Sequence, residues 1–331
     1  MKIGIIGCGK QAEKHLKGFR SSGLTDFVVS DISAERASAF AEAHGTTFAA
    51  STQDLLADTT VHGVAICTPT PTHYPLIKSA IAQGKHYLVE KPLSDTLEQA
   101  QELADATEQA GLVGAVGFTY RFAPSLVAAN ELLREAPDEL GKIATATLRI
   151  GGRGSHEVWK HQKKTGGGAI QEMLVHMVDL AVWMFGEMDQ IKLLDCQQFQ
   201  PVRQIKGEAH NVDAEDYVVA RLTSKSGTVV TLVGDFITPS FVQYLEIQGQ
   251  NGTAMGSIQG HINAFVFKNT DGNRYSRGAH DLAVERTDIV ADLDKNFVDA
   301  MRGECGPRCS VSDAVEVQRI TEEILRQANS L

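Results

Sequence analysis

The stretch HYLVEKPLS (residues 86–94) places a charged pair, Glu90 and Lys91, directly after an apolar run. Buried strands usually end in small polar turn residues, whereas here Pro92 fixes the backbone behind the lysine. The carboxyl ends of parallel strands border the ligand crevice of an open α/β sheet, so Lys91 is a candidate reactive group. The alternative is a lysine that extends from a surface turn into water.

A second set of chemically active side chains lies on a helix predicted over residues 169–185. Glu172 and His176 are four residues apart and share one helix face, and Asp179 lies close to that face. The three glycines at 166–168 remove side chains where a backbone or a ligand must approach. The polar residues resemble a metal-ligand set, but no Cys or His cluster accompanies them, and we expect no metal. The alternative for His176 is a hydrogen-bonded core histidine.

Near the amino terminus, the segment IGIIGCGKQAEKH contains the spacing Gly7-x-Gly9-x-x-Ala12, directly after a predicted strand and at the start of a predicted helix. Such glycines allow a tight turn and close approach of a pyrophosphate to the helix amino terminus, so the motif predicts a dinucleotide site. Asp31 ends the second predicted strand, where a carboxylate accepts hydrogen bonds from both ribose hydroxyls and repels a 2′-phosphate. This favours NAD, with NADP as the alternative. A helix cap is the other role for Asp31.

Alternating strands and helices position these residues, as is typical of a parallel sheet with helices on both faces. Thr68, Pro69 and His73 follow a strand at 61–67 and are placed to border the cofactor, unless the proline only marks a turn. The predicted strands are 2–6, 27–30, 61–67, 86–89 and 112–116, and the predicted helices are 10–22, 33–44 with Ser33 as cap, 72–83 and 96–110.

The pattern changes near residue 120, where the chain becomes rich in strands around one helix and ends in a helical tail from residue 292, broken at GECGPRC. We expect an α/β protein with an N-terminal Rossmann domain (1–120) built on a doubly wound parallel sheet. A C-terminal α+β domain (121–331) would hold an open, mostly antiparallel sheet, and the last helix is a candidate to pack back on the first domain. Besides a helix at 124–135, the predicted elements are strands at 142–150, 191–199, 217–223, 228–235, 244–248 and 264–267, with hairpin turns at 224–228 and 249–253.

Composition narrows the classes of function. The 331 residues, 43% hydrophobic and 22% charged, fit two globular domains. The formal net charge of −10 argues against a nucleic-acid partner. We expect no secretory signal and no membrane span, because the first apolar segment is short and no run approaches the length of a span. Five cysteines, an odd number, indicate a reduced cytosolic protein, with Cys305 and Cys309 as a metal or redox pair the alternative.

Three segments together resemble the Gfo/Idh/MocA family, named from glucose–fructose oxidoreductase and inositol dehydrogenase. They are the glycine motif, EKP at 90–92 and GGGAIQEMLVHMVD at 166–179, in matching order and spacing over nearly the whole chain. The resemblance implies hydride transfer between a secondary alcohol and C4 of a nicotinamide, and a cis Lys91–Pro92 bond. The expected cofactor-binding residues are Gly7, Gly9, Lys10, Gln11, Ala12, Asp31, Thr68, Pro69, His73, Glu90, Lys91 and Arg121.

The resemblance also implies catalytic roles for Lys91, His176 and Glu172. A base that titrates near neutral pH suits removal of the hydroxyl proton, which is the role of the family's histidine at the position of His176. Lys91 would stabilise the alkoxide-like charge and orient the hydroxyl. The family commonly has Asp at the position of Glu172 and Gly at that of Leu174, so Glu172 either orients His176 or contacts a substrate hydroxyl. The expected substrate-binding residues are Lys91, Tyr120, Trp159, Glu172 and His176.

We therefore expect a cytoplasmic NAD-dependent dehydrogenase of a sugar, polyol or sugar derivative, without nucleic-acid or membrane partners. Arg153, His156, Trp159, Lys160 and His161 form a candidate substrate loop, with a solvated loop as the alternative. As in the family, a homodimer or homotetramer would cover the open sheet. Other functions on this scaffold are a non-catalytic dinucleotide-sensing regulator, an enzyme that recycles tightly bound NAD, and an enzyme whose alcohol or imine is not on a sugar.

Overall fold

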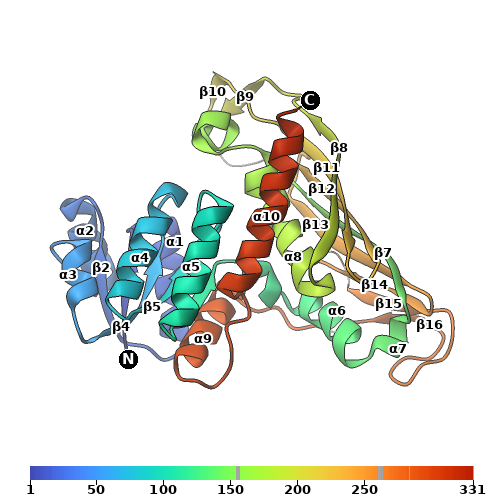
Figure 1. The fold of residues 1–331 in the computed structure, drawn as a ribbon, viewed down its shortest axis with the longest axis horizontal. Helices are drawn as coiled ribbons and strands as arrows, with labels where there is room; N and C mark the ends of the chain where they lie inside the picture. The colour runs from blue at the N-terminus through green and yellow to red at the C-terminus, as the bar shows by residue number, and fades with distance from the viewer. Residues whose placement is uncertain (154–156, 260–261, 263, 283, 331) are drawn as a thin grey trace. The chain divides into compact units, whose positions relative to one another are not determined.

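The computed structural model describes residues 1–153, 157–259, 262, 264–282 and 284–330 (Figure 1). The chain forms two compact units. The first contains Met1–Phe122 and Thr287–Gln318, and the second contains Ala123–Arg286 and Arg319–Leu331. A segment close to the carboxyl terminus therefore belongs to the same unit as the amino terminus.

The first unit is built on a six-stranded sheet in the order β3-β2-β1-β4-β5-β6, with all strands parallel. Its strands are β1 (Lys2–Ile6), β2 (Asp26–Ser30), β3 (Thr47–Phe48), β4 (Val61–Ile66), β5 (His86–Val89) and β6 (Gly114–Val116). The predicted doubly wound parallel sheet is confirmed. Strand order reverses beside β1, so the carboxyl ends of β1 and β4 mark where such folds bind ligands.

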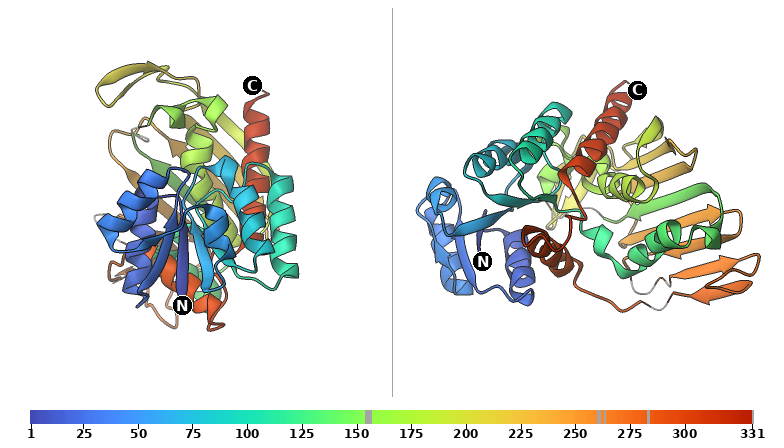
Figure 2. Two further views of the ribbon diagram at one scale, coloured as in Figure 1. Left: turned by 90° about the vertical axis from the view of Figure 1, so that its left-hand side faces the viewer. Right: turned by 60° about the horizontal axis from the view of Figure 1, so that its bottom comes forward.

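Helices lie on both faces of this sheet (Figure 2). They are α1 (Lys10–Ser21), α2 (Ala34–His44), α3 (Thr52–Ala57), α4 (His73–Ala82), α5 (Leu97–Gln109) and α9 (Ile289–Met301). Because β–α–β crossovers are right-handed, α1 and α2 lie on one face and α3, α4 and α5 on the other. α9 packs beside α1. The Ser33 hydroxyl accepts from the Arg36 N–H, so the predicted cap of α2 is confirmed.

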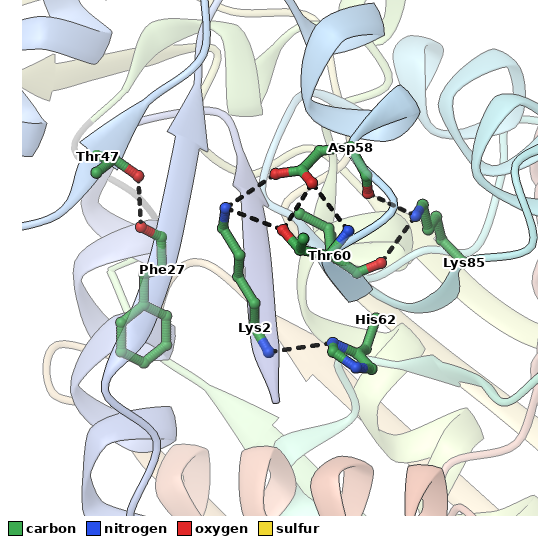
Figure 3. Close-up of polar contacts among 8 residues, drawn as sticks. Lys2, Phe27, Thr47, Asp58, Thr60, His62 and Lys85 are labelled. Atoms are coloured by element: carbon green, nitrogen blue, oxygen red, sulfur yellow. Dashed lines mark hydrogen bonds and ion pairs between the residues drawn. The ribbon is translucent and has the colours of Figure 1, made fainter.

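Two short elements of this unit and the start of one helix escape the sequence pattern. β3 has two exposed residues and depends on pairing with β2, where the Thr47 hydroxyl donates to the Phe27 carbonyl (3.0 Å; Figure 3). α3 has six residues, of which Leu55 and Leu56 are buried. α9 begins before the predicted start of the helical tail, because the Asp288 carboxylate caps it.

The amino ends of the strands carry a group that we call the amino-edge cluster: Lys2, Asp58, Thr60 and Lys85 (Figure 3). The Asp58 carboxylate accepts from the Lys2 ammonium at 2.9 Å and from the N–H and hydroxyl of Thr60 at 2.8 and 2.6 Å. The Lys85 ammonium donates to the backbone carbonyls of Asp58 and Val61, each at 2.8 Å. These contacts fix the entry of the chain into β1, β4 and β5.

The second unit is built on an eight-stranded sheet in the order β16-β15-β14-β13-β7-β12-β11-β8. β7 and β12 pair in parallel, and the other neighbouring strands are antiparallel, so the prediction of a mostly antiparallel sheet is confirmed. The strands are β7 (Ile143–Gly151), β8 (Met188–Gln197), β11 (Tyr217–Ser224), β12 (Val229–Asp235), β13 (Val242–Gly249), β14 (Gly252–Gly256), β15 (Phe265–Lys268) and β16 (Gly278–Asp281), and a separate hairpin contains β9 (Val202–Ile205) and β10 (Glu208–Asn211).

The apolar helix α8 (Val175–Phe185) supplies core surface to this unit and packs against β7 and β12. By length and composition alone, the stretch Lys163–Phe185 is apolar enough to cross a membrane, but 67% of its apolar window is buried inside the structure. A core helix has the same composition, so this stretch is weak evidence for a span. The remaining helices are α6 (Pro124–Glu135), α7 (Pro137–Leu140) and α10 (Val311–Ala328).

Candidate active site

The glycine loop between β1 and α1 has one closed side and one open side. Gly7 is buried with φ of +92°, and a Cβ there would lie 2.8 Å from the Cys67 carbonyl oxygen, so this position requires glycine. A Cβ on Gly9 would meet no described protein atom within 4 Å. Ala12 is fully buried and lets α1 pack close to the sheet. The open side therefore lies at the amino terminus of α1, where Lys10 and Gln11 are exposed.

Asp31 supports this loop from the end of β2. Its Oδ2 accepts from the Cys8 N–H at 2.9 Å, and its Oδ1 accepts from the Ser33 N–H at 2.9 Å and from Arg36 Nη2 at 2.7 Å. Burial raises the pKa of Asp31, but these donors outweigh burial and lower it. Asp31 thus fixes the glycine loop at Cys8 and the turn before α2, whose N-cap is Ser33, and its contact with a ribose stays a prediction.

Three loops at the carboxyl edge of the sheet are joined to one another. The ring nitrogens of buried His73 each lie 2.8 Å from a carbonyl oxygen, one of Thr68 after β4 and one of Pro92 after β5. The Gln11 amide donates to Glu90 at 2.6 Å, which ties α1 to the loop after β5. The Lys91–Pro92 peptide bond is cis, as the resemblance implies. Of the remaining predicted residues at this edge, Pro69 is exposed, and Thr68 and Lys91 are half-buried.

Arg121, expected to bind the cofactor, has a structural position instead. Its side chain is fully buried, and Nη1 donates to the Arg308 carbonyl at 2.8 Å and to the Asp313 carboxylate at 2.5 Å. A guanidinium enclosed in this way holds the segment after β6 against the start of α10. Its neighbour Tyr120 is half-buried, and burial raises the pKa of its phenol to about 12, so the hydroxyl keeps its proton at neutral pH.

Glu172 and His176 lie in the second unit, on the helix that follows the three glycines. This helix begins as a π-helical turn (Ile170–Leu174), in which the Val175 N–H bonds to the Ile170 carbonyl five residues earlier, and continues as α8. The predicted helical segment over 169–185 is therefore present, with a π-helical first turn that the sequence pattern does not indicate. Such π turns are frequent at functional sites.

The glycines allow two neighbouring segments to approach the start of this helix. A Cβ on Gly167 would lie 2.5 Å from the Lys160 carbonyl group, and a Cβ on Gly168 would lie 2.2 Å from the Glu215 carboxylate. Glu215 was not predicted from the sequence. Its Oε1 accepts from the Ile170 N–H and its carbonyl from the Ala169 N–H, each at 3.0 Å. Glu215 thus caps the helix from a distant loop, which no local sequence signal reveals.

The segment before the glycines places a charged pair beside an aromatic face. The Lys160 ammonium forms an ion pair with Glu172 and lies 5.0 Å from the ring centroid of Trp159, which is 46% exposed. His161 is buried with its ring edge against Phe236, so it supports the loop from within. Arg153 is exposed. His156 lies outside the described residues.

Leu174 stands where the family commonly has glycine, and the strand beside it makes room for the larger side chain. Its side chain is fully buried, and a Cβ on Gly234 of β12 would lie 3.1 Å from Leu174 Cδ1. A glycine in the strand thus makes room for the larger residue on the helix.

The residues of the first unit fit a bound dinucleotide. The open side at Gly9 leaves space for a pyrophosphate at the amino terminus of α1, whose first N–H groups have no partner within the helix. Asp31 stands at the end of β2, where a ribose is bound in such folds. Among the described residues, no group of three or more His, Cys, Asp and Glu side chains is arranged to hold a metal ion.

Comparison with known families agrees with this geometry. The family model described as an oxidoreductase family with an NAD-binding Rossmann fold matches residues 1–118, and the model of that family's C-terminal alpha/beta domain matches residues 136–330, more than half of the chain. This chain belongs to the Gfo/Idh/MocA oxidoreductase family.

Two curated members of the family share part of their length with this chain. D-glucoside 3-dehydrogenase of Escherichia coli is 30% identical over 210 residues, which cover 61% of this chain and 58% of that protein. Levoglucosan dehydrogenase of Pseudarthrobacter phenanthrenivorans is 25% identical over 260 residues, which cover 69% of this chain and 66% of that protein. The chain thus matches less than two thirds of the length of each. The solved structure of a levoglucosan dehydrogenase with NADH and L-sorbose has a TM-score of 0.87 at 21% identity, covering 100% of this chain and 97% of that one, so the fold is shared.

Proposed function

We propose that this family member is an NAD(P)-dependent oxidoreductase that transfers a hydride between the nicotinamide and a secondary alcohol or ketone of a sugar, polyol or sugar derivative. One observation carries the proposal. Lys91 and the glycine loop lie at the same edge of one parallel sheet, and the His73 and Gln11–Glu90 contacts join their loops. An ammonium beside a dinucleotide cradle suits a reaction in which negative charge develops on an alcohol oxygen.

The chain's own residues would handle the proton and the charge. When bound, the nicotinamide accepts or supplies the hydride at C4. Lys91 orients the substrate hydroxyl and stabilises the charge that builds on its oxygen. His176, from the second unit, takes the hydroxyl proton on a ring nitrogen, because imidazole titrates near neutral pH. Glu172, on the helix that carries His176, balances the charge of Lys160 from the segment before the glycines.

A sugar or polyol is the proposed substrate class. An exposed indole face next to a charged pair suits a ring that carries several hydroxyl groups, since the ring stacks on Trp159 while the hydroxyls bind Lys160 and Glu172. The names of the two curated relatives, which refer to a glucoside and to levoglucosan, support the same class.

We propose that NAD is preferred over NADP. The preference should be weaker than the one that an aspartate without a cationic neighbour would give. Arg36, whose side chain is 62% exposed, pairs with Asp31 at 2.7 Å and offsets part of the charge that repels a 2′-phosphate. Asp31→Ser should therefore shift the ratio of kcat/KM values about 10-fold toward NADP, equivalent to roughly 1.4 kcal/mol. The control is Arg36→Gln, which should shift the ratio toward NAD. An unchanged ratio in both variants would remove these residues from cofactor choice.

We also propose a cytoplasmic homodimer or homotetramer that covers one face of the eight-stranded sheet. Val219, Val233, Tyr244 and Phe267 lie on that face by strand register, and Phe267 is 48% exposed. All five cysteines are free thiols, as suits a reducing compartment. Light scattering tests the assembly, and a monomer at micromolar concentration contradicts it.

The function is tested with a panel of sugars, sugar acids and inositols, assayed with NAD and then NADP by nicotinamide absorbance. Lys91→Ala is run beside the wild type. We expect turnover that falls at least about 10³-fold in the variant while NAD binding is retained. Turnover that survives in Lys91→Ala contradicts the role of the lysine. Tight NAD binding without turnover on any compound would favour a dinucleotide sensor or a recycled cofactor.

A further inference from the structure

A buried chain of charged side chains connects α9 to the loop that carries Lys91. His15, on α1, has Nδ1 2.6 Å from Asp294 Oδ1 on α9 and Nε2 3.2 Å from Glu90 Oε1. The Gln11 amide donates to the same Glu90 oxygen at 2.6 Å. The side chains of His15, Asp294 and Glu90 are 3%, 0% and 15% exposed. Glu90 is the residue directly before Lys91, so this series of charged side chains ends at the proposed reactive group.

The two ring nitrogens of His15 each face a carboxylate, which identifies the ring as an imidazolium that donates to both. Burial alone would lower its pKa, but Asp294 and Glu90 outweigh burial and raise the pKa of His15 to about 10. Burial would raise the pKa of Glu90, but His15, Lys91 and Gln11 lower it to about 2. At neutral pH a buried cation therefore holds Glu90 ionised beside Lys91.

Asp294 depends on the same cation. Burial raises the pKa of Asp294 to about 6 against the attraction of His15, and Asp288 adds further negative charge nearby. Asp294 Oδ2 has no hydrogen-bond partner among the described residues, and a Cβ on Gly18 would lie 2.0 Å from it. The Cys67 thiol also faces Glu90 and Asp294, and burial with these charges raises its pKa, so it stays neutral.

Stability alone does not explain the buried charges of His15, Asp294 and Glu90. A buried ion pair seldom repays the desolvation of its charges, and apolar residues of similar volume stabilise a core as well or better. Buried charges of this kind gather at functional sites. Here the charges end in the loop after β5, whose other contacts already serve the candidate active site.

We propose that His15 and Asp294 are positioning residues for Lys91 and that they act through Glu90. The proposal rests on the hydride transfer proposed above. Two donors, His15 and Gln11, fix the Glu90 side chain and with it the backbone from which Lys91 extends. The Glu90 carboxylate also supplies a fixed negative charge beside the ammonium. Asp294 holds the imidazolium in the orientation that makes both interactions.

Glu90→Gln and Asp294→Asn test the proposal with little change of shape. In each variant kcat should fall about 10- to 100-fold, and in Asp294→Asn, which lies outside the cofactor-binding residues, the Kd for NADH should stay within about 2-fold. Because both residues act on Lys91 through one chain, the double variant should be no slower than the slower single variant. In Asp294→Asn, kcat should also begin to fall at a lower pH than in the wild type as the pH rises, since His15 loses its proton earlier. His62→Asn, an exposed histidine at the opposite edge, is the matched control and should leave kcat unchanged.

Three results would overturn the proposal: folded Glu90→Gln and Asp294→Asn with kcat within about 2-fold of the wild type, a double variant whose loss is the product of the single losses, or an unshifted pH profile. Nitrogen NMR of His15 in the wild type decides the case if the variants do not fold. Two protonated ring nitrogens from pH 6 to 9 support the proposal, and a neutral ring at pH 7 overturns it. If the wild type turns over nothing on the panel, the proposed function fails separately, and the NMR result still decides whether the buried cation exists.

Discussion

Two lysines stand at opposite ends of one strand, because Lys85 precedes β5 and Lys91 follows it. Lys85 is 6% exposed, and its ammonium donates to two backbone carbonyls in the amino-edge cluster (Figure 3). Lys91 is half-buried and lies beside Glu90, in a loop whose contacts lead to the glycine loop. The same residue type thus closes one edge of the sheet and, in the proposed function, performs chemistry at the other.

The two edges differ in what their polar groups bind. At the amino edge Lys2, Asp58 and Lys85 bind other groups of the protein itself. At the carboxyl edge Gly9 has an open side, and a buried cation holds a carboxylate next to the lysine. The carboxyl edge therefore combines space beside Gly9 with a charged Glu90 that a buried residue, His15, holds in place.

The largest predicted effect comes from a substitution in the glycine loop, at the carboxyl edge. Gly7→Ala should lower the free energy of unfolding by about 3 kcal/mol or more, because the residue has a left-handed φ and its Cβ would press on the Cys67 carbonyl. NADH binding should be lost with it. Urea unfolding and fluorescence titration with NADH measure the two effects.

Gly9→Ala is the matched control for that variant. Its Cβ would meet no described atom within 4 Å, so stability should stay within about 0.5 kcal/mol while NADH affinity alone falls. Equal losses of stability in both variants would show that the loop has no open side.

At the amino edge, Lys85→Met should affect stability without affecting chemistry. It removes the Lys85 donor from the carbonyls of Asp58 and Val61, of which the Asp58 carbonyl keeps the Val61 N–H, and this should lower the free energy of unfolding by about 2 kcal/mol. The kcat of the folded variant should stay within about 2-fold of the wild type. A large loss of kcat at unchanged stability would contradict the assignment of the amino edge to structure.

The strongly patterned parts of the fold could be predicted from the sequence. β1 and β5 begin and end as predicted, because each is an apolar run between clear turn signals. The missed elements are short or depend on partners that are distant in sequence. β14 (GTAMG) has two glycines and one β-branched residue, so its local signal is weak, and β13 and β15 pair with it on either side.

The residues of the candidate site also fall into two groups, those with a local sequence signal and those whose partners are distant in sequence. Motif residues such as Gly7, Asp31 and Lys91 carry local signals, so they could be named from sequence, and their roles remain predictions. His15 and Asp294 are 279 positions apart, and His15 lies on the buried face of α1, where the pattern favours an ordinary core residue. Their partnership follows from α9 packing beside α1, which no local pattern contains.

The dependence of stability on alkaline pH also distinguishes the two edges. The pKa of His15 is about 10 in the folded chain against 6.5 for the free group, so the native state keeps a proton that the unfolded state has lost. This contribution is complete below pH 6.5 and disappears as the pH rises toward 10, so the free energy of unfolding should fall by about 1 kcal/mol per pH unit between pH 7 and 9. At the amino edge the sign is opposite, because burial lowers the pKa of Lys85 and raising the pH removes no stability there. Urea unfolding across this range measures the slope, which should flatten in His15→Asn and persist in Lys85→Met. If the slope persists in His15→Asn, other groups cause the dependence of stability on alkaline pH. That result would contradict the assignment of His15 as a buried imidazolium.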